Sequence, residues 1–194
     1  MMNKWLALNV LRQPKYYQEY SHALNDEQIK NVLASTQNLP LKQGTVSNFI
    51  SSETYRRVKT ISIPLSAEYL WLHDWAKNFI FEVNNKNFGY ELLRMEPLQY
   101  IEYHADQQGM VHHHLDWYCD YQPRKLSMTI QLSDPAEYDG GDLNISINLE
   151  KPFTASKNKG DAIVFPSFLM HNVNTVTRGV RRSLVVWCIG PEFR

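Results

Sequence analysis

The chain is poor in cysteine, has no net charge and contains no long apolar segment. Its two cysteines among 194 residues, Cys119 and Cys188, lie far apart without C-x-x-C spacing, which excludes a disulfide scaffold and fits a reducing compartment. Lys+Arg and Asp+Glu number 20 each, so charge gives no reason to expect nucleic acid or an anionic membrane as a partner. No apolar run reaches membrane-spanning length, and the first residues show no signal-peptide pattern. We therefore expect a cytoplasmic protein with one domain, residues 1–194.

Residues 1–90 are predicted to form a mixed helical and strand region that supports the rest of the domain. Asn25 is a predicted helix N-cap, and a second helix is expected after Pro64 with Ser66 as its N-cap. A short strand is expected between the two helices, over residues 60–64. The apolar residues at helical spacing are Ile29, Val32 and Leu33 in the first helix, and Leu72, Trp75 and Phe79 in the second.

From about residue 91 the pattern changes to short strands without crossover helices. Apolar and polar residues alternate in two runs, and Asp139-Gly140-Gly141 between them predicts a hairpin turn. The apolar positions are Leu126, Met128, Ile130 and Leu132 in the first run, and Leu143, Ile145 and Ile147 in the second. We therefore predict a mainly β (α+β) fold. Residues 91–194 would form a double-sheet jelly-roll core, with the N-terminal helices packed against one sheet.

His114, Asp116 and His171 are the candidate metal ligands. His114 and Asp116 are two residues apart in a predicted strand, so their side chains point to the same side and can bind one metal together. Two histidines and one carboxylate can occupy one face of an octahedral Fe(II) and leave three positions open. Those positions are what a non-haem oxygenase needs for a co-substrate and O₂.

Arg181 and Ser183 are the candidate anion-binding residues. They lie in the apolar segment 180–189, which reads as a buried strand, and alternation puts them on the face opposite to Arg182. A buried guanidinium without an anion is very costly. A dicarboxylate that chelates iron through a 2-oxo acid group would present its far carboxylate to Arg181, with the Ser183 hydroxyl adding a hydrogen bond.

The segment from about residue 98 to 194 resembles the catalytic core of the 2-oxoglutarate- and Fe(II)-dependent oxygenases, and is closest to their prolyl-4-hydroxylase-like branch. The resemblance implies a double-stranded β-helix, iron ligation by the His/Asp/His set, and binding of the 2-oxoglutarate tail by Arg181. It also implies a co-substrate contact by Tyr103, with Tyr100 as the alternative, although Val111 stands where an aromatic residue is common. The matching segments are residues 99–103, 114–116 (His114-Leu115-Asp116), 140–143, 165–167 and 171–187.

The function implied by this resemblance is that of a 2-oxoglutarate-dependent dioxygenase that hydroxylates a C–H bond. It would use Fe(II), 2-oxoglutarate and O₂, with ascorbate as a candidate reductant, and release succinate and CO₂. The implied substrate is a peptidyl side chain, prolyl first, with a free amino acid or small metabolite as the alternative. The sequence does not determine the oligomeric state.

Two other functions are compatible with parts of the pattern. A cupin-like metal enzyme could use His112 with His114 and would have no need of Arg181 or 2-oxoglutarate. A jelly-roll module that only binds a sugar or peptide would have no need of His171.

Several neighbouring residues have two interpretations. Arg124 and Lys125 are interpreted as surface charges, with the substrate entrance as the alternative. Trp117 and Tyr118 could cover the metal or pack in the core. The remaining histidines, His22, His73 and His104, are interpreted as ordinary polar residues.

Overall fold

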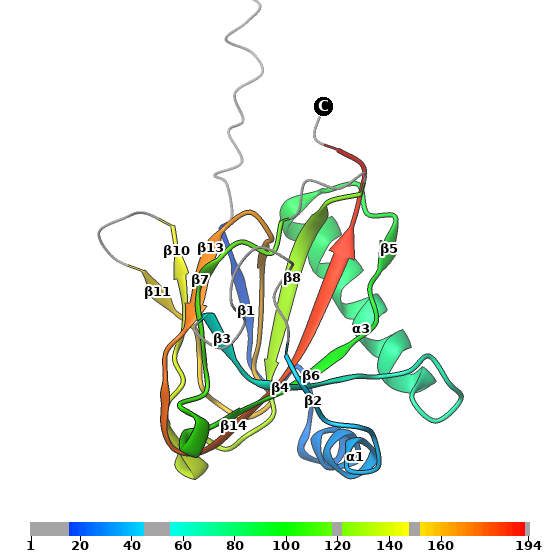
Figure 1. Cartoon of the computed structure of the whole chain (residues 1–194). Coiled ribbons are helices and arrows are strands. Elements are labelled where there is room, and N and C mark those ends of the chain that lie inside the picture. Colours follow the sequence, from blue (N-terminus) through cyan, green and yellow to red (C-terminus); the bar gives the residue numbers. More distant parts are fainter. Residues whose placement is uncertain (1–15, 45–54, 118–121, 148–151, 193–194) are drawn as a thin grey trace, which may run out of the picture.

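Two antiparallel sheets, with two helices on the outside of the larger one, make up the computed structural model (Figure 1). The structure describes residues 16–44, 55–117, 122–147 and 152–192. The larger, nine-stranded sheet has the order β1-β12-β8-β14-β6-β4-β2, with β5 and β9 also paired to β14; we call it the major sheet. The five-stranded minor sheet has the order β11-β10-β13-β7-β3. The predicted jelly roll is confirmed.

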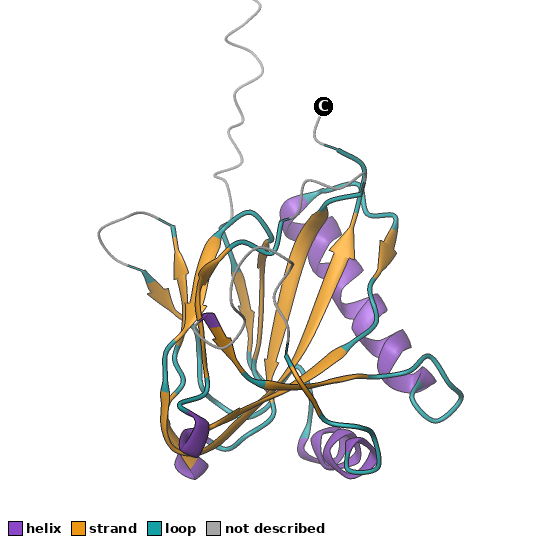
Figure 2. Ribbon diagram, in the orientation of Figure 1, coloured by secondary structure: helices purple, strands orange, loops and turns teal. Residues whose placement is uncertain are grey.

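Figure 2 shows which parts of the chain are strands and which are helices. The major sheet contains β1 (Gln18–Tyr20), β2 (Lys42–Gln43), β4 (Lys59–Ser62), β5 (Arg94–Met95), β6 (Gln99–His104), β8 (Arg124–Gln131), β9 (Tyr138–Gly140), β12 (Ala162–Pro166) and β14 (Val176–Ile189). The minor sheet contains β3 (Arg56–Arg57), β7 (Met110–His114), β10 (Leu143–Ser146), β11 (Phe153–Thr154) and β13 (Met170–Val173). The helices are α1 (Asp26–Thr36), α3 (Leu70–Val83), η2 (Asn84–Phe88), η3 (Ala105–Gln107) and η4 (Pro135–Glu137). None of these helices is long and apolar enough to cross a membrane.

The alternation of the central strands separates two cores. In β8, Leu126, Met128 and Ile130 point to the side of α1 and α3 and belong to the core between those helices and the major sheet. The intervening residues of β8, which include Ser127 and Thr129, are also buried, so β8 is covered on both faces. A second apolar core lies between the two sheets and takes residues from β6, β7, β10 and β14. The candidate site lies on the side of this second core.

Helix α1 begins where the sequence predicts it. The Asn25 side chain accepts a hydrogen bond from the Gln28 backbone N–H, and the Gln28 side chain accepts one from the Asn25 N–H, both at 2.9 Å. This capping box satisfies two of the backbone donors at the start of the helix. Ile29 and Val32 then face the core beneath α1.

The predicted start of the second helix is wrong. Residues 66–69 form a turn, α3 begins at Leu70, and its N-cap is Tyr69 rather than Ser66. The reason is tertiary, because the Tyr69 ring is buried and its hydroxyl donates to the Ser35 carbonyl of α1 at 3.1 Å. Leu72 is buried as predicted, whereas Trp75 and Phe79 are only partly buried against the same core.

The sequence predicted that the Gly140–Gly141 turn joins two strands of one hairpin. This prediction is wrong. Strands β8 and β10 belong to different sheets, and β9 between them pairs with the beginning of β14. Both glycines have positive φ, 73° and 65°. A Cβ atom on Gly140 would lie 2.1 Å from the Thr175 carbonyl oxygen, so only glycine allows this close approach. Alternation predicted the two strands but could not predict their partners.

Candidate metal and co-substrate site

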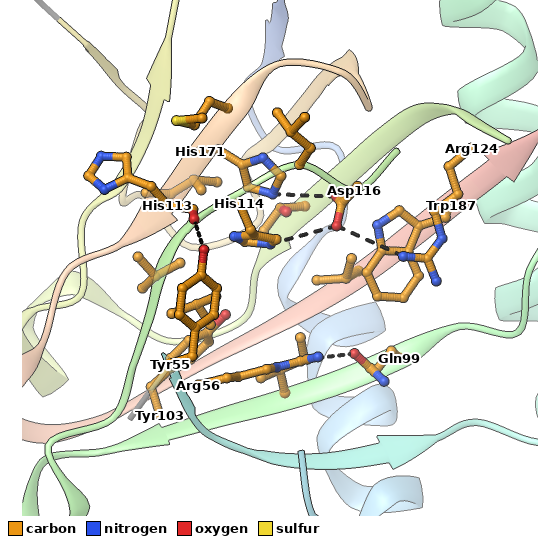
Figure 3. A pocket seen from close by; sticks show the side chains of 18 of the residues that line it. Tyr55, Arg56, Gln99, Tyr103, His113, His114, Asp116, Arg124, His171 and Trp187 are labelled. Carbon is orange, nitrogen blue, oxygen red and sulfur yellow. Dashed lines mark hydrogen bonds and ion pairs between the residues drawn. The ribbon is translucent and has the colours of Figure 1, made fainter. Parts of the chain in front are cut away.

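His114, Asp116 and His171 meet at one end of the space between the sheets (Figure 3). His114 ends β7, Asp116 follows two residues later, and His171 comes from β13, whose register places it directly opposite His114. His114 Nε2 lies 3.7 Å from Asp116 Oδ1, and His171 Nε2 lies 3.4 Å from Asp116 Oδ2. One ligand atom from each residue fits within 4.8 Å of the others.

Backbone carbonyls orient both imidazole rings. His114 Nδ1 lies 2.9 Å from the His112 carbonyl oxygen, and His171 Nδ1 lies 2.9 Å from the Leu169 carbonyl oxygen. A carbonyl can only accept, so each Nδ1 carries the proton, and the Nε2 of a neutral ring then presents its lone pair to Asp116. Such a hydrogen bond on the far nitrogen is usual for histidines that bind metals. In the neutral tautomers the group consists of acceptors only, and a cation satisfies such a set.

A pair of serines fixes the Asp116 carboxylate. Ser127 Oγ donates to Asp116 Oδ2 at 2.7 Å and lies 2.9 Å from Ser167 Oγ. The Ser167 carbonyl accepts from the backbone N–H groups of Asp116 and Trp117, each at 3.0 Å. Ser167, which directly follows β12, therefore holds Asp116 in place. Ser127 was missed because it occupies a polar position of an alternating strand, which is usually a solvent-facing one.

The pKa values of all three groups are shifted in the metal-free protein. Burial works against a charged His171, but the adjacent Asp116 carboxylate raises its pKa above the usual value. Burial and the proximity of His171 lower the pKa of His114 to about 4, with a smaller contribution from the nearby charge of Arg56. Burial opposes ionisation of Asp116, but the two histidines and the Ser127 hydrogen bond lower its pKa overall. Asp116 is therefore ionised at neutral pH.

The sequence suggested that Arg124 and Lys125 are surface charges, but the structure buries both side chains for the most part. Arg124 lines the pocket that contains the triad. Its guanidinium binds Glu96 at two points, 2.8 and 2.6 Å, stacks 4.0 Å from the Trp187 ring centroid, and has Nη1 3.9 Å from Asp116 Oδ1. Lys125, on the other face of β8, is 3% exposed. Strand β8, which follows the H-x-D motif, thus brings Arg124 back to the site. The sequence pattern could not indicate this.

Arg181 lies at the closed end of the same cavity, whose volume is about 530 Å³. The residue is 1% exposed, and within the described part of the chain its Nε, Nη1 and Nη2 atoms have no hydrogen-bond partner. The hydroxyl of Ser183, on the same face of β14, is likewise buried without a partner. An uncompensated buried guanidinium costs several kcal/mol, about as much as breaking a buried ion pair. The site therefore fits a carboxylate ligand.

Tyr103, and not Tyr100, lies beside Arg181. Tyr103 pairs with Arg181 across the β6–β14 ladder, and the Arg181 guanidinium carbon lies 4.8 Å from the Tyr103 ring centroid. Tyr100 points to the other face of β6, where its hydroxyl donates to Glu102 at 2.7 Å. Arg182 also lies on that other face and pairs with Glu102.

Other residues singled out in the sequence lie outside the metal group. His112 is exposed, and His113 lines the pocket without joining the triad. Trp117 is half-buried and is not among the described residues that line the pocket. Tyr118 and Cys119 fall outside the described residues, whereas Cys188 is a buried core residue in which burial raises the thiol pKa to about 12.

Residues 98–189 match the family model of the 2OG-Fe(II) oxygenase superfamily. The matched segment contains all three members of the triad together with Arg181 and Ser183. It is a 2OG-Fe(II) oxygenase core. Strands from outside this core complete both sheets, since β1 and β4 join the major sheet and β3 joins the minor sheet.

The chain also resembles curated proteins over a short stretch. A PKHD-type hydroxylase of Psychrobacter sp. (strain PRwf-1) is 44% identical over 62 residues, which is 32% of this chain and 24% of that protein. A PKHD-type hydroxylase of Caulobacter vibrioides is 42% identical over 62 residues, 32% of this chain and 27% of that protein. The chain thus matches about a quarter of the length of these relatives.

Solved structures resemble almost the whole chain. A Pseudomonas putida prolyl-4-hydroxylase has a TM-score of 0.72 at 20% identity, covering 91% of this chain and 94% of its own. A Trichoplax adhaerens prolyl hydroxylase in complex with a hypoxia inducible factor peptide fragment has a TM-score of 0.75 at 15% identity, covering 89% and 83%. The fold around the oxygenase core is therefore prolyl-4-hydroxylase-like.

Proposed function

We propose that this protein is a 2-oxoglutarate-dependent Fe(II) dioxygenase that hydroxylates a C–H bond of a peptidyl side chain, prolyl in the first place. One observation carries the proposal. A convergent set of metal ligands and a buried guanidinium without a partner open on the same cavity. The set of metal ligands requires a cation. The guanidinium of Arg181 requires an anion, which must extend to it from the bound cation.

The chain's own residues would divide the work as follows. His114, Asp116 and His171 would hold Fe(II), with Ser127 fixing the carboxylate. Arg181 and Ser183 would bind the distal carboxylate of 2-oxoglutarate, with the Tyr103 ring against the guanidinium. When bound with O₂ and 2-oxoglutarate, the iron supplies oxidative decarboxylation of the co-substrate and hydroxylation of the substrate, with release of succinate and CO₂.

The substrate class is supported by the neighbours' names alone. Prolyl-4-hydroxylases share the fold, and the Trichoplax adhaerens neighbour was solved with a peptide. A free amino acid or small metabolite remains the alternative substrate, and ascorbate remains a candidate reductant. A cytoplasmic location rests on the sparse cysteines alone, and one domain over residues 1–194 on the chain length.

An anaerobic titration tests the proposal. Adding 2-oxoglutarate to the Fe(II)-loaded protein should produce the weak visible charge-transfer band of the chelate, and aerobic turnover with substrate should release succinate. Iron binding without the band would refute the co-substrate and favour the cupin-like alternative. Failure to bind iron at all would favour the binding-module alternative.

The pH dependence of metal binding should reflect the loss of a proton from one histidine, His171. Each histidine must be neutral to bind the metal, and the raised pKa of His171 makes it the group that loses a proton on binding near neutral pH. His114, with its pKa at about 4, is already neutral there. Apparent Fe(II) affinity should therefore fall about tenfold per pH unit below the raised pKa of His171. Anaerobic titrations from pH 8 to 5 measure this slope, and a hundredfold loss per unit would contradict it.

Gly141→Ala should weaken co-substrate binding through Arg181. Gly141 has a φ of 65°, and a Cβ there would lie 2.9 Å from Arg181 Cδ. The left-handed backbone costs an L-residue about 1–2 kcal/mol, and the contact should also displace the guanidinium. Gly89→Ala is the matched control, since its φ is 71° with no atom within 4 Å of the added Cβ. We expect both variants to lose thermal stability, Gly141→Ala more than Gly89→Ala because of its added close contacts, and we expect weaker 2-oxoglutarate binding only in Gly141→Ala. Equal 2-oxoglutarate affinities in the two variants would contradict the role of Gly141.

A further inference from the structure

Three consecutive histidines end β7, and the last of them is the candidate metal ligand. In a regular strand, side chains alternate between the two faces. Val111 is 6% exposed and belongs to the core between the two sheets. Alternation from Val111 would therefore point His113 into this space and His114 away from it. The structure shows the reverse, since His114 joins the triad and His113 is exposed.

A β-bulge in β7 causes this reversal. Strand β13 pairs antiparallel with β7, and the register joins His171 to His114 and Val173 to Val111. The two paired positions are two residues apart in β13 but three residues apart in β7, so β7 contains one additional residue. An additional residue reverses the alternation of the side chains that follow it. The bulge therefore determines which of the three histidines faces His171.

Side chains donate hydrogen bonds to the backbone carbonyls within the bulge. His114 Nδ1 donates to the His112 carbonyl at 2.9 Å, which orients the ring of the ligand. The Tyr55 hydroxyl donates to the His113 carbonyl (Figure 3). A bulge locally disrupts the hydrogen bonds of the ladder, so side-chain donors of this kind stabilise it.

Tyr55 reaches the bulge from the neighbouring edge strand. It directly precedes β3, whose first residue, Arg56, pairs with Val111 of β7. This register places Tyr55 beside His112, and the centroids of the two rings lie 5.5 Å apart. Tyr55 also lines the pocket that contains the triad. It therefore contacts the bulge twice, through its ring and through its hydroxyl.

We propose that Tyr55 is a positioning residue of the metal site, which holds the bulge in β7 and so selects His114 from three consecutive histidines as the ligand. This inference rests on the proposed function, since it assumes that the triad binds a metal. Without the Tyr55 hydroxyl, the His113 carbonyl loses its donor. A regular β7, which points His113 toward His171, then becomes more populated, and the ligand set binds metal more weakly.

Metal titrations of the full chain test the proposal without relying on turnover. Tyr55→Phe removes the hydroxyl and keeps the ring. Its affinity for Fe(II), measured by anaerobic calorimetry, should fall about 10- to 100-fold, as is typical when a partner outside the ligand shell is removed. Tyr100→Phe is the matched control, since the Tyr100 hydroxyl donates to Glu102 on the other face of the major sheet. This control should keep the wild-type affinity, and thermal unfolding of both metal-free variants checks that they fold.

His113→Ala separates positioning of the ligand from a general loss of stability. In the wild-type background it should leave Fe(II) affinity unchanged, because the bulge turns His113 away from the triad. In the Tyr55→Phe background it should lower the affinity further, because His113 then contributes to metal binding. Wild-type affinity in Tyr55→Phe, or no effect of His113→Ala in either background, would overturn the proposal. Absence of Fe(II) binding by the wild-type protein would instead refute the proposed function.

Discussion

His171→Ala is expected to lose at least about 100-fold in Fe(II) affinity and all substrate-dependent succinate release. Removing even an outer-shell partner of a metal ligand typically costs 10–100-fold, so loss of a ligand should cost more. The substitution also leaves Asp116 in a buried place without its closest cationic partner, which costs about 3–5 kcal/mol of stability. Metal titration by calorimetry, together with thermal unfolding, measures both effects.

A second variant guards against simple misfolding of His171→Ala. His171→Gln keeps a polar side chain in the same space, so it should fold better and still fail to support turnover. His112→Ala is the matched control, since His112 is exposed and lies on the same strand as His114. If His112→Ala lost iron while His171→Ala kept it, the cupin-like pair would be the correct assignment.

Arg181→Met should act in opposite directions on stability and on co-substrate binding. In the metal-free protein the guanidinium is buried without a hydrogen-bond partner among the described residues, so replacing it with an apolar side chain removes a desolvation cost. Replacing buried ion pairs with apolar residues is often neutral or stabilising by about 1–4 kcal/mol, and we expect a gain within this range. Loss of a buried partner for a carboxylate costs about 2–5 kcal/mol of binding, which is about 30- to 5000-fold in the Kd of 2-oxoglutarate.

Thermal unfolding of the metal-free protein and the anaerobic 2-oxoglutarate titration measure the two effects. A stability gain of this size should raise Tm by several degrees in a chain of this length. Arg182→Met is the control on the other face of the same strand, where Arg182 pairs with Glu102 at 3.3 Å with its side chain 32% exposed. It should change stability by less than about 1 kcal/mol and leave the Kd unchanged. If Arg181→Met retained wild-type affinity, the tail of the co-substrate would have to bind elsewhere.

Predictions from the local sequence were correct where only the local backbone determines the structure. The two-residue period separated Arg181 and Ser183 from Arg182. His114 and Asp116 do meet at one site, but β7 ends at His114, so Asp116 is placed by its hydrogen bonds with Ser127 and Ser167 and not by strand alternation. The capping rule likewise gave the start of α1, because all its partners lie within four residues. These features depend on dihedral geometry and near neighbours, which the sequence specifies directly.

Predictions from the local sequence failed where a contact with a residue far away in the sequence determines the structure. The start of α3 depends on the contact of Tyr69 with Ser35, and the path after Gly141 depends on β14. Arg124 looked like a surface charge because Glu96 and Trp187, which hold it in the pocket, are far away in sequence. Such contacts form only when the sheets are closed.

The sequence by itself therefore determined the residue types of the candidate site, its order along the chain and the face on which Arg181 and Ser183 lie. Tertiary structure decided how they meet. Pairing of β13 with β7 brings His171 opposite His114, and Ser127 fixes Asp116 from the facing sheet. The bridge from Arg56 to Gln99 likewise joins two sheets. The physical reason is that side-chain direction is a property of each strand, whereas strand pairing depends on burying both apolar faces at once.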